Sequence, residues 1–516
     1  MNDDRSYDPL LLTGAAKWCR RQIGENRVPL FSALLVGMMC YGYAFTNKLI
    51  NHDDVQSMFN KGATVTSGRW GLGALDTIFP NYSMPWANGI LTLIFIAIAA
   101  CLIVRVLSIR SHTLQALLAG SVVAFPSLIG TFGYMFTSNS FGLSFLLASL
   151  AVWLLCRKGI LFGILALGCM IFSLSIYQSY ISLAAGLLVL VLLGQLLDGE
   201  DVLAVIRRGV GYVLFLILSL GLYYAATQIV LILKDEVLNS YASGNVSFQL
   251  STIPASIALA YQNFFRFFTE GFHGLIPTKL SQLLHTLLVV GTLLLLVLRL
   301  TSAHLRSTGR IILAILLVGL IPLAVCCMYL FTAADSVHTL VLYGFVTVYA
   351  LAILAMDRAL DDIPMKCLSQ IGTNLISLVL GLIIVSNVFL ANEVWLNLQL
   401  RYENAFAFYT SVLSDLQALP EFTEEMPIAI LGDHAEPEFY ETEFSFCSTI
   451  TGVKGFKPDS YSREKFFTYY LGVELPFLDP QACQALASEP DIAAMPSYPY
   501  YGSIQVVNGT IIVKLS

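Results

Sequence analysis

The sequence predicts a polytopic α-helical membrane protein with about eleven transmembrane helices and a C-terminal α/β domain. Three observations support this fold class: 57 % of the 516 residues are hydrophobic, only 12 % are charged, and the apolar residues gather in long runs. A soluble globular domain has about twice that share of charged residues. The composition therefore excludes a soluble enzyme of this length, as well as collagen-like, disordered and disulfide-scaffold proteins.

The first 28 residues precede the first apolar run and mix apolar side chains with cations. Trp18 and Ile23 share this segment with Arg20 and Arg21. The mixture is typical of an amphipathic helix on the cytoplasmic surface of a membrane, and equally of a charge cluster that only directs insertion.

Residues 29–391 contain eleven apolar runs. A helix that crosses a bilayer needs roughly 17–25 mostly apolar residues, so the shorter runs require their polar flanks to complete the span. The expected spans are residues 29–48, 88–104, 114–132, 141–155, 160–176, 181–197, 210–233, 283–298, 311–330, 340–356 and 371–390.

The distribution of Lys and Arg gives these spans an orientation. Cations occur before the first span and in every second turn, whereas the short turns around Thr137, Ser179 and Asp335 contain none. Because positively charged turns stay in the cytoplasm, the N-terminus is expected to be cytoplasmic, and eleven spans put the C-terminal domain on the outer side. The charged turns contain Arg105 and Arg110, Arg157 and Lys158, Arg207 and Arg208, Arg299, Arg306 and Arg310, and Arg358 and Lys366.

Three long segments are expected on the outer side: residues 50–87, 234–282 and 392–516. Long connections in an otherwise compact protein are usually functional. From Glu393 onward the chain has 6 Lys and Arg against 17 Asp and Glu, and so acidic a domain argues against nucleic acid as a partner.

The segment 392–516 has the signals of an α/β domain. Residues 392–419 favour a helix, and the apolar run 427–431 ends at a glycine as a strand would. The sequence Asn508-Gly509 separates two apolar runs, 504–507 and 510–515. Because Asn-Gly suits the positive dihedral angles of a tight primed turn, these runs are expected to form a hairpin.

The first candidate for chemistry is a carboxylate pair directly after the first span, in the sequence Asn51-His52-Asp53-Asp54. Two adjacent carboxylates can supply a general base and an orienting group, and Asp can accept a hydroxyl proton. The alternative is that they only cap a short helix. His52 has no metal-ligand partners at a useful spacing, so it is expected to be a polar neighbour of the carboxylates.

Other candidates lie in the outer turns. Arg69 and Trp70 follow Gly68; an arginine can neutralise a phosphate with a planar fork of donors, while Trp70 either stacks on a sugar or anchors the membrane interface. The turn with Tyr177, Gln178 and Tyr180 has hydroxyl and amide groups that could bind a sugar. The alternative is that its tyrosines form part of an aromatic belt at the membrane interface. Arg266 and Lys279 are cations that could bind a phosphate. The alternative is that they lie on the polar face of an interfacial helix.

The ten cysteines show no metal-ligand spacing. Cys447 and Cys483 are the only two in the outer domain, and in an oxidising compartment they either form a disulfide or remain as free thiols, since spacing alone does not show proximity. None of the expected spans has Asp or Glu near its centre, which argues against a proton- or ion-coupled carrier.

The order of these motifs resembles a known family. A carboxylate pair at the start of the first outer loop resembles the GT-C superfamily of membrane glycosyltransferases. More closely, Asn51-His52-Asp53-Asp54, Gly68-Arg69-Trp70 and Tyr177-Gln178 resemble the glucosyltransferase II family, the serotype-converting O-antigen glucosyltransferases of bacteria and their phages. The resemblance covers roughly residues 29–391, the GT-C-like catalytic region with its loops 50–87 and 234–282.

The resemblance implies transfer of glucose from undecaprenyl-phosphate glucose to a surface glycan (O antigen of lipopolysaccharide), on the periplasmic face of the bacterial inner membrane. The N-terminus would be cytoplasmic and the C-terminal domain periplasmic. Such transferases work beside a synthase that makes the glucosyl lipid and a flippase that turns it over. The alternatives are a lipid-linked sugar flippase, or an O-antigen polymerase or ligase.

A mechanism follows from the resemblance. One carboxylate, with Asp54 preferred and Asp53 as its orienting partner, accepts the proton of the acceptor hydroxyl, which attacks the anomeric carbon with inversion. Arg69, with Arg266 or Lys279, stabilises the departing phosphate. A monophosphate leaving group that is matched by cations does not require a metal, so no metal or other cofactor is expected.

Overall fold

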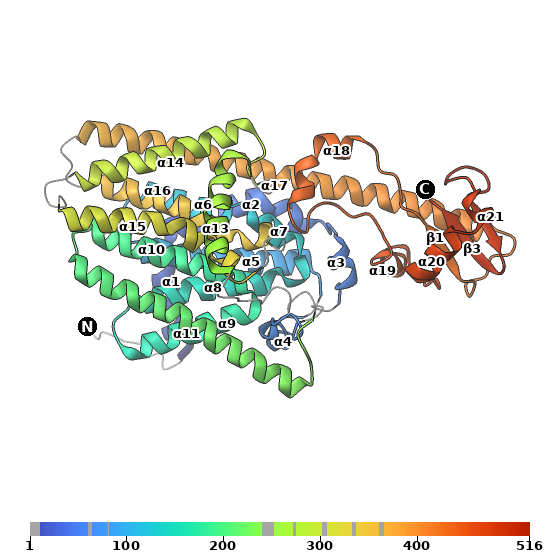
Figure 1. The fold of residues 1–516 in the computed structure, drawn as a ribbon, viewed down its shortest axis with the longest axis horizontal. Helices are drawn as coiled ribbons and strands as arrows, with labels where there is room; N and C mark the ends of the chain where they lie inside the picture. The colour runs from blue at the N-terminus through green and yellow to red at the C-terminus, as the bar shows by residue number, and fades with distance from the viewer. Residues whose placement is uncertain are drawn as a thin grey trace, which may run out of the picture.

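The computed structural model describes residues 11–59, 64–80, 82–239, 252–271, 275–301, 307–332, 337–360 and 366–516. Parts of the predicted N-terminal segment and of the loops 50–87 and 234–282 therefore lie outside the described residues. Figure 1 shows a bundle of roughly parallel helices with a smaller domain at one end. The protein is a mostly helical membrane protein, in agreement with the predicted class.

The bundle contains most of the described helices. They are α2 (Arg27–Thr46), α5 (Pro85–Val106), α6 (His112–Val123), α7 (Ser127–Gly133), α8 (Met135–Leu155), α9 (Ile160–Ile176), α10 (Ile181–Leu197), α11 (Val202–Lys234), α14 (Lys279–Leu300), α15 (Thr308–Val325), α16 (Val346–Ala359) and the first part of α17 (Lys366–Gln417). α1 (Leu11–Glu25) precedes the bundle and exposes Trp18 and Ile23; its place on a membrane surface remains a prediction.

Eight helices among the described residues are long and apolar enough to cross a bilayer, fewer than the eleven predicted spans. The run 114–132 is divided into α6 and α7, which are bent by 49°. Pro126 explains this break, because proline lacks a backbone N–H and disfavours helix at the residue before it. Counting the bent pair as one span gives nine.

The two remaining predicted spans form shorter helices. α9 has 17 residues. The run 340–356 begins with two 3-10 turns, η6 (Thr339–Val341) and η7 (Tyr343–Phe345), and continues as α16 with 14 residues. Every residue of α16 is buried, so this helix lies in the protein core, where hydropathy alone cannot tell it from a lipid-facing span.

The two ends of the bundle differ in charge. At one end, Lys and Arg side chains from alternate turns bind carboxylates and backbone carbonyls, and we call it the cationic end. α2 runs from there to the opposite end, which we call the loop end because residues 47–59 and 64–80 lie there. This sorting agrees with the predicted alternation of turns, while the sides of the membrane remain a prediction. Contacts at the cationic end include Arg105–Glu25, Arg110–Asp357, Arg358–Asp198, Arg299–Leu197 O and Arg310–Gly199 O.

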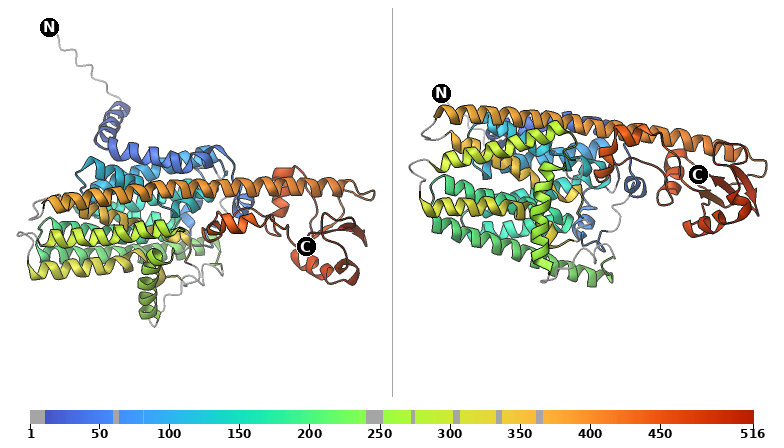
Figure 2. Two further views of the ribbon diagram at one scale, coloured as in Figure 1. Left: turned by 90° about the horizontal axis from the view of Figure 1, so that it is seen from above. Right: turned by 45° about the horizontal axis from the view of Figure 1, so that its top comes forward.

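The last predicted span does not end at the membrane region. α17 has 52 residues, which corresponds to roughly 78 Å at the helical rise, far more than a bilayer requires. Figure 2 shows it running from the bundle into the C-terminal domain. The predicted helix 392–419 is thus the continuation of the span rather than a separate element.

The C-terminal domain contains a three-stranded sheet in the order β1-β3-β2. β1 (Ile428–Leu431) pairs in parallel with β3 (Thr510–Lys514), and β2 (Ile504–Val507) pairs antiparallel with β3. The predicted strand and hairpin are confirmed, and Asn508 and Gly509 have φ of 51° and 77°, as a primed turn requires. The surrounding helices are α18 (Phe439–Glu443), η8 (Ser445–Thr449), α19 (Arg463–Phe466), the π-helical turn η9 (Phe467–Leu471), α20 (Pro480–Ala487) and α21 (Pro490–Ala493).

The disulfide considered between Cys447 and Cys483 is not formed, since both thiols are free. Cys447 is buried with Ile450 and Val453 in the hydrophobic core that continues into the bundle. Cys483 packs against a separate small core around Ala429 and Ile512 of the sheet. The two cysteines therefore serve different cores.

His434 connects the sheet to α17 and gives the C-terminal domain a pH dependence. Its Nε2 lies 2.8 Å from Oδ1 of Asn404, and its ring stacks on Phe408. Burial, with a contribution from Lys457, lowers the pKa of His434 from 6.5 to about 4. Between these values the unfolded chain takes up a proton that the folded chain does not, so folded-state stability is lost as the pH falls through this window.

We expect the unfolding temperature to fall between pH 7 and pH 4.5, and His434→Gln to reduce that fall. The measurement is thermal unfolding of the detergent-solubilised chain at both pH values. His112→Gln, at an exposed position of the cationic end, is the matched control and should behave as the wild type. An unchanged pH dependence in His434→Gln would contradict this role.

Candidate functional site

The carboxylate pair lies on a one-turn helix at the loop end, α3 (His52–Gln56). Asn51 caps this helix, because its side-chain oxygen accepts a hydrogen bond from the backbone N–H of Asp54 at 2.8 Å. The Asn51 amide donates to the carbonyls of Gly133 and Gly452, at 2.7 and 2.9 Å. One residue thus fixes α3 to both the bundle and the C-terminal domain.

Asp54 is fully buried. The ammonium of Lys48 and the hydroxyl of Ser83 donate to its two carboxylate oxygens, and Lys48 also donates to Ser83. A buried carboxylate needs such partners, since an unpaired buried charge is strongly unfavourable. Sequence analysis did not assign Lys48, although a lysine at the end of the first predicted span, six residues before Asp54, was a usable signal.

Asp53 has a different environment from its neighbour. Its carboxylate is partly exposed, and Oδ1 accepts a hydrogen bond from the hydroxyl of Tyr461 at 3.2 Å. Burial and the charge of Asp53 raise the pKa of Tyr461, so this phenol remains a donor. Asp53 is therefore the carboxylate that a hydroxyl substrate can approach.

His52 completes this group, which we call the carboxylate cluster (Lys48, Asn51, His52, Asp53, Asp54 and Tyr461). Nδ1 of His52 lies 2.8 Å from the hydroxyl of Ser462 and 3.4 Å from a carboxylate oxygen of Asp459. Ser462 and Asp459 belong to the same C-terminal turn as Tyr461. Among the described residues no three His, Cys, Asp or Glu side chains form a metal-binding group.

The second group surrounds Arg69, which precedes α4 (Trp70–Leu75). Gly68 has a φ of +73°, and its carbonyl accepts a hydrogen bond from the hydroxyl of Tyr223 at 2.9 Å. Gln178, in η1 (Gln178–Tyr180), donates to the same hydroxyl at 2.8 Å. Trp70 donates its indole N–H to Thr227 at 3.2 Å. The predicted motifs at residues 68–70 and 177–178 are therefore in contact, with α11 joining them.

The guanidinium of Arg69 lies over the ring of Tyr177, 5.3 Å from its centroid, and Tyr177 in turn stacks on Phe141. The buried Nε of Arg69 has no hydrogen-bond partner, and no carboxylate pairs with this arginine within the described part of the chain. An arginine that is held against an aromatic ring without a counterion is suited to binding a phosphate. We call Arg69, Trp70, Tyr177, Gln178 and Tyr223 the arginine cluster.

Three other predicted site residues, Tyr180, Arg266 and Lys279, form different contacts. Tyr180 is buried among Phe145, Tyr177 and Tyr343, so its side chain packs in the bundle.

Arg266, on α13 (Ile253–Thr269), pairs with Glu270, and Lys279 donates to Gln282 at the start of α14. Among the described residues no hydrogen bond or ion pair joins either cation to Arg69, Asp53 or Asp54.

One comparison with known proteins gives a match. The profile of a family described as "Glucosyl transferase GtrII" matches residues 42–349, about three fifths of the chain. No curated protein and no solved structure is significantly similar to the chain. The matched region contains Asp53, Asp54 and the whole arginine cluster, and it ends before α17 and the C-terminal domain.

Proposed function

The chain belongs to the glucosyl transferase GtrII family, which implies glucosyltransferase activity in glycan modification, and from this membership we propose its donor, acceptor and mechanism. The donor is undecaprenyl-phosphate glucose, and the acceptor is a hydroxyl of a surface glycan, the O antigen. Transfer takes place on the periplasmic face of the bacterial inner membrane, after a synthase and a flippase have supplied the glucosyl lipid.

The environment of the two carboxylates supports the proposal most directly. Asp54 is saturated by Lys48 and Ser83 and is fully buried, whereas Asp53 is partly exposed. A general base must come within hydrogen-bond reach of the proton that it accepts. We therefore assign the base to Asp53 and give Asp54 a structural role, the reverse of the order preferred from sequence.

The reaction is a single displacement. The acceptor hydroxyl gives its proton to Asp53 and its oxygen forms a bond to the anomeric carbon of glucose. The bond from that carbon to the phosphate oxygen breaks at the same time, and undecaprenyl phosphate leaves with the electron pair. Attack opposite the leaving group inverts the anomeric configuration.

Arg69 is proposed to bind the phosphate of the donor as its negative charge increases in the transition state. Placed cations of this kind are among the largest contributions to catalysis. Tyr177 and the hydrogen bonds of Gln178 and Tyr223 hold the surrounding backbone and ring in place. Arg266 and Lys279, whose partners among the described residues include Glu270 and Gln282, are given no role in this step.

Replacing Arg69 by Gln is expected to lower kcat/KM by about a hundredfold, because one charged donor to the leaving group is lost. Arg69→Lys should recover only part of the activity, since an ammonium does not reproduce the planar fork. Arg266→Gln, which removes an exposed cation already paired with Glu270, is the matched control and should stay within a fewfold of wild type. Equal losses in both Gln variants would contradict the assignment.

The function itself is tested with the purified chain, synthetic undecaprenyl-phosphate glucose and isolated O antigen in detergent. A transferase yields glucosylated glycan without a membrane or gradient, and the inverted linkage is read by nuclear magnetic resonance. A lipid-linked sugar flippase gives no product under these conditions. Release of a lipid pyrophosphate rather than a monophosphate would indicate a polymerase or ligase.

A further inference from the structure

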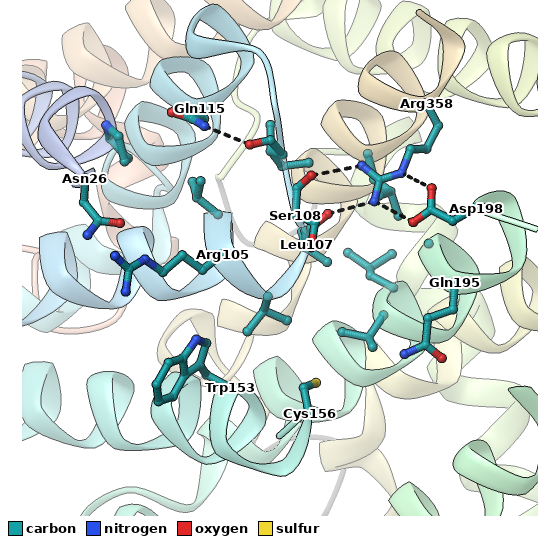
Figure 3. A pocket seen from close by; sticks show the side chains of 18 of the residues that line it. Asn26, Arg105, Leu107, Ser108, Gln115, Trp153, Cys156, Gln195, Asp198 and Arg358 are labelled. Atoms are coloured by element: carbon teal, nitrogen blue, oxygen red, sulfur yellow. Dashed lines mark hydrogen bonds and ion pairs between the residues drawn. The ribbon is translucent and has the colours of Figure 1, made fainter. Parts of the chain in front are cut away.

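A cavity of about 670 Å³ lies at the cationic end of the bundle, opposite the carboxylate cluster. Its lining comes from the ends of α2, α5, α8, α10 and α16 and from the turn 107–109, and Figure 3 shows most of the lining side chains. Its size is in the range of small-ligand sites. Neither the family match nor the proposed transfer reaction requires a site there.

Arg358 lines one side of the cavity; it is buried, and all of its guanidinium nitrogens form hydrogen bonds. Its guanidinium donates to Asp198 at 2.7 and 3.0 Å and to the carbonyls of Leu107 and Ser108 (Figure 3). It also donates to Asp357 at 2.7 Å. These bonds join three turns of the bundle. Arg358 therefore shapes the cavity and has its charge neutralised within the protein.

Arg157 supplies a charge that no described carboxylate neutralises. Its guanidinium lies over the ring of Trp153, 4.3 Å from the centroid, and no carboxylate pairs with it among the described residues. Arg105, also in the lining, is paired with Glu25 at 3.0 Å. The lining thus retains one positive charge, which suits a single anionic group.

The remaining lining combines polar and apolar surfaces. Gln195 and Asn26 are at its polar part (Figure 3), while Val104, Leu107, Leu190 and Leu354 form apolar walls. Trp153 is in the last turn of α8 and Arg157 follows just after the helix. This pairing of an amphipathic ring with a cation is typical of the head-group level of a membrane. We propose that the cavity binds the phosphate head group of an anionic membrane lipid.

The test measures thermal unfolding of the full chain in detergent with added short-chain phosphatidylglycerol. We expect it to raise the unfolding temperature of the wild type by at least about 3 °C, and short-chain phosphatidylcholine to have no such effect. Arg157→Gln should weaken binding of phosphatidylglycerol by about tenfold. Arg157→Lys keeps the charge but not the planar fork, so its affinity for phosphatidylglycerol should lie between those of the wild type and Arg157→Gln.

The matched control is Arg207→Gln, which removes an exposed cation at the same end but outside the cavity. This variant should keep the full rise in unfolding temperature with phosphatidylglycerol. Equal losses of that rise in the Arg157 and Arg207 variants would attribute it to general surface charge and overturn the proposed binding site. Glycerol 3-phosphate separates a lipid from a soluble phosphate: a rise equal to that with phosphatidylglycerol would overturn the lipid assignment. None of these readouts depends on glucosyl transfer.

Discussion

Replacing Asp53 by Asn is expected to lower the rate of glucosyl transfer by about a thousandfold, within the range usual for loss of a general base. The amide keeps the size of the side chain and can still accept the hydrogen bond from Tyr461, but it cannot take the proton of the acceptor hydroxyl. Because Asp53 is partly exposed and forms no ion pair with a described residue, the unfolding temperature should stay close to that of the wild type. The measurement is kcat on the purified chain together with its unfolding temperature.

The comparison variant is Asp54→Asn, which changes the neighbouring carboxylate in the same way. If Asp54 is structural, this variant should lose folded protein while the transfer rate per folded molecule falls much less than in Asp53→Asn. A folded but inactive Asp54→Asn variant beside an active Asp53→Asn variant would restore the order preferred from sequence. Tyr461→Phe, which removes only the hydrogen bond to Asp53, should have an intermediate effect.

The helical framework was predictable because hydropathy reports which segments avoid water. Each of the eleven apolar runs contains helix, and the Asn508-Gly509 hairpin followed from backbone preference alone. The number of spans was less predictable, since a run such as 340–356 is apolar because it packs inside the protein. Length and hydropathy do not separate burial in protein from burial in lipid.

The site was predictable only where its residues are close in sequence. Asn51, Asp53 and Asp54 lie within one turn, whereas the link between Gly68 and Gln178 runs through the hydroxyl of Tyr223 and was not predicted. Tyr461 is 408 residues from Asp53, and no local pattern marks it. The tail enters the site through tertiary contacts, which a single sequence does not specify.

The contacts of Tyr461 and its neighbours join the C-terminal domain to the matched region beside Asp53, where the proposed acceptor would bind. The family match ends at residue 349, yet Tyr461, Ser462 and Asp459 from beyond it lie against His52 and Asp53. If Asp53 is the base, the proposed acceptor position lies between the matched region and the C-terminal domain. Under the proposed function, we expect substitutions in this turn to change which hydroxyl is glucosylated.

The ion pair between Lys48 and Asp54 is expected to have the largest effect on stability. Asp54→Asn and Lys48→Met should each lower the free energy of unfolding by about 3 kcal/mol, because each leaves a partner without its countercharge in a largely buried setting. Asp54 is fully buried and the Lys48 side chain is 28 % exposed. The double variant should lose clearly less than the sum of the two, with a coupling of at least about 1.5 kcal/mol. Unfolding is followed by titration with SDS.

The pair Arg208–Glu200 is the matched control, since both of its side chains are exposed and such surface pairs show little coupling. Additive losses at Lys48 and Asp54 would contradict the structural role of their contact. A coupled result ties stability to the site, because the bonds from Lys48 and Ser83 to the Asp54 carboxylate hold α3 in place beside the separate Asn51 cap. The neighbouring residue, Asp53, then keeps its carboxylate toward Tyr461, so under the proposed mechanism the structural carboxylate of the pair orients the one that acts as base.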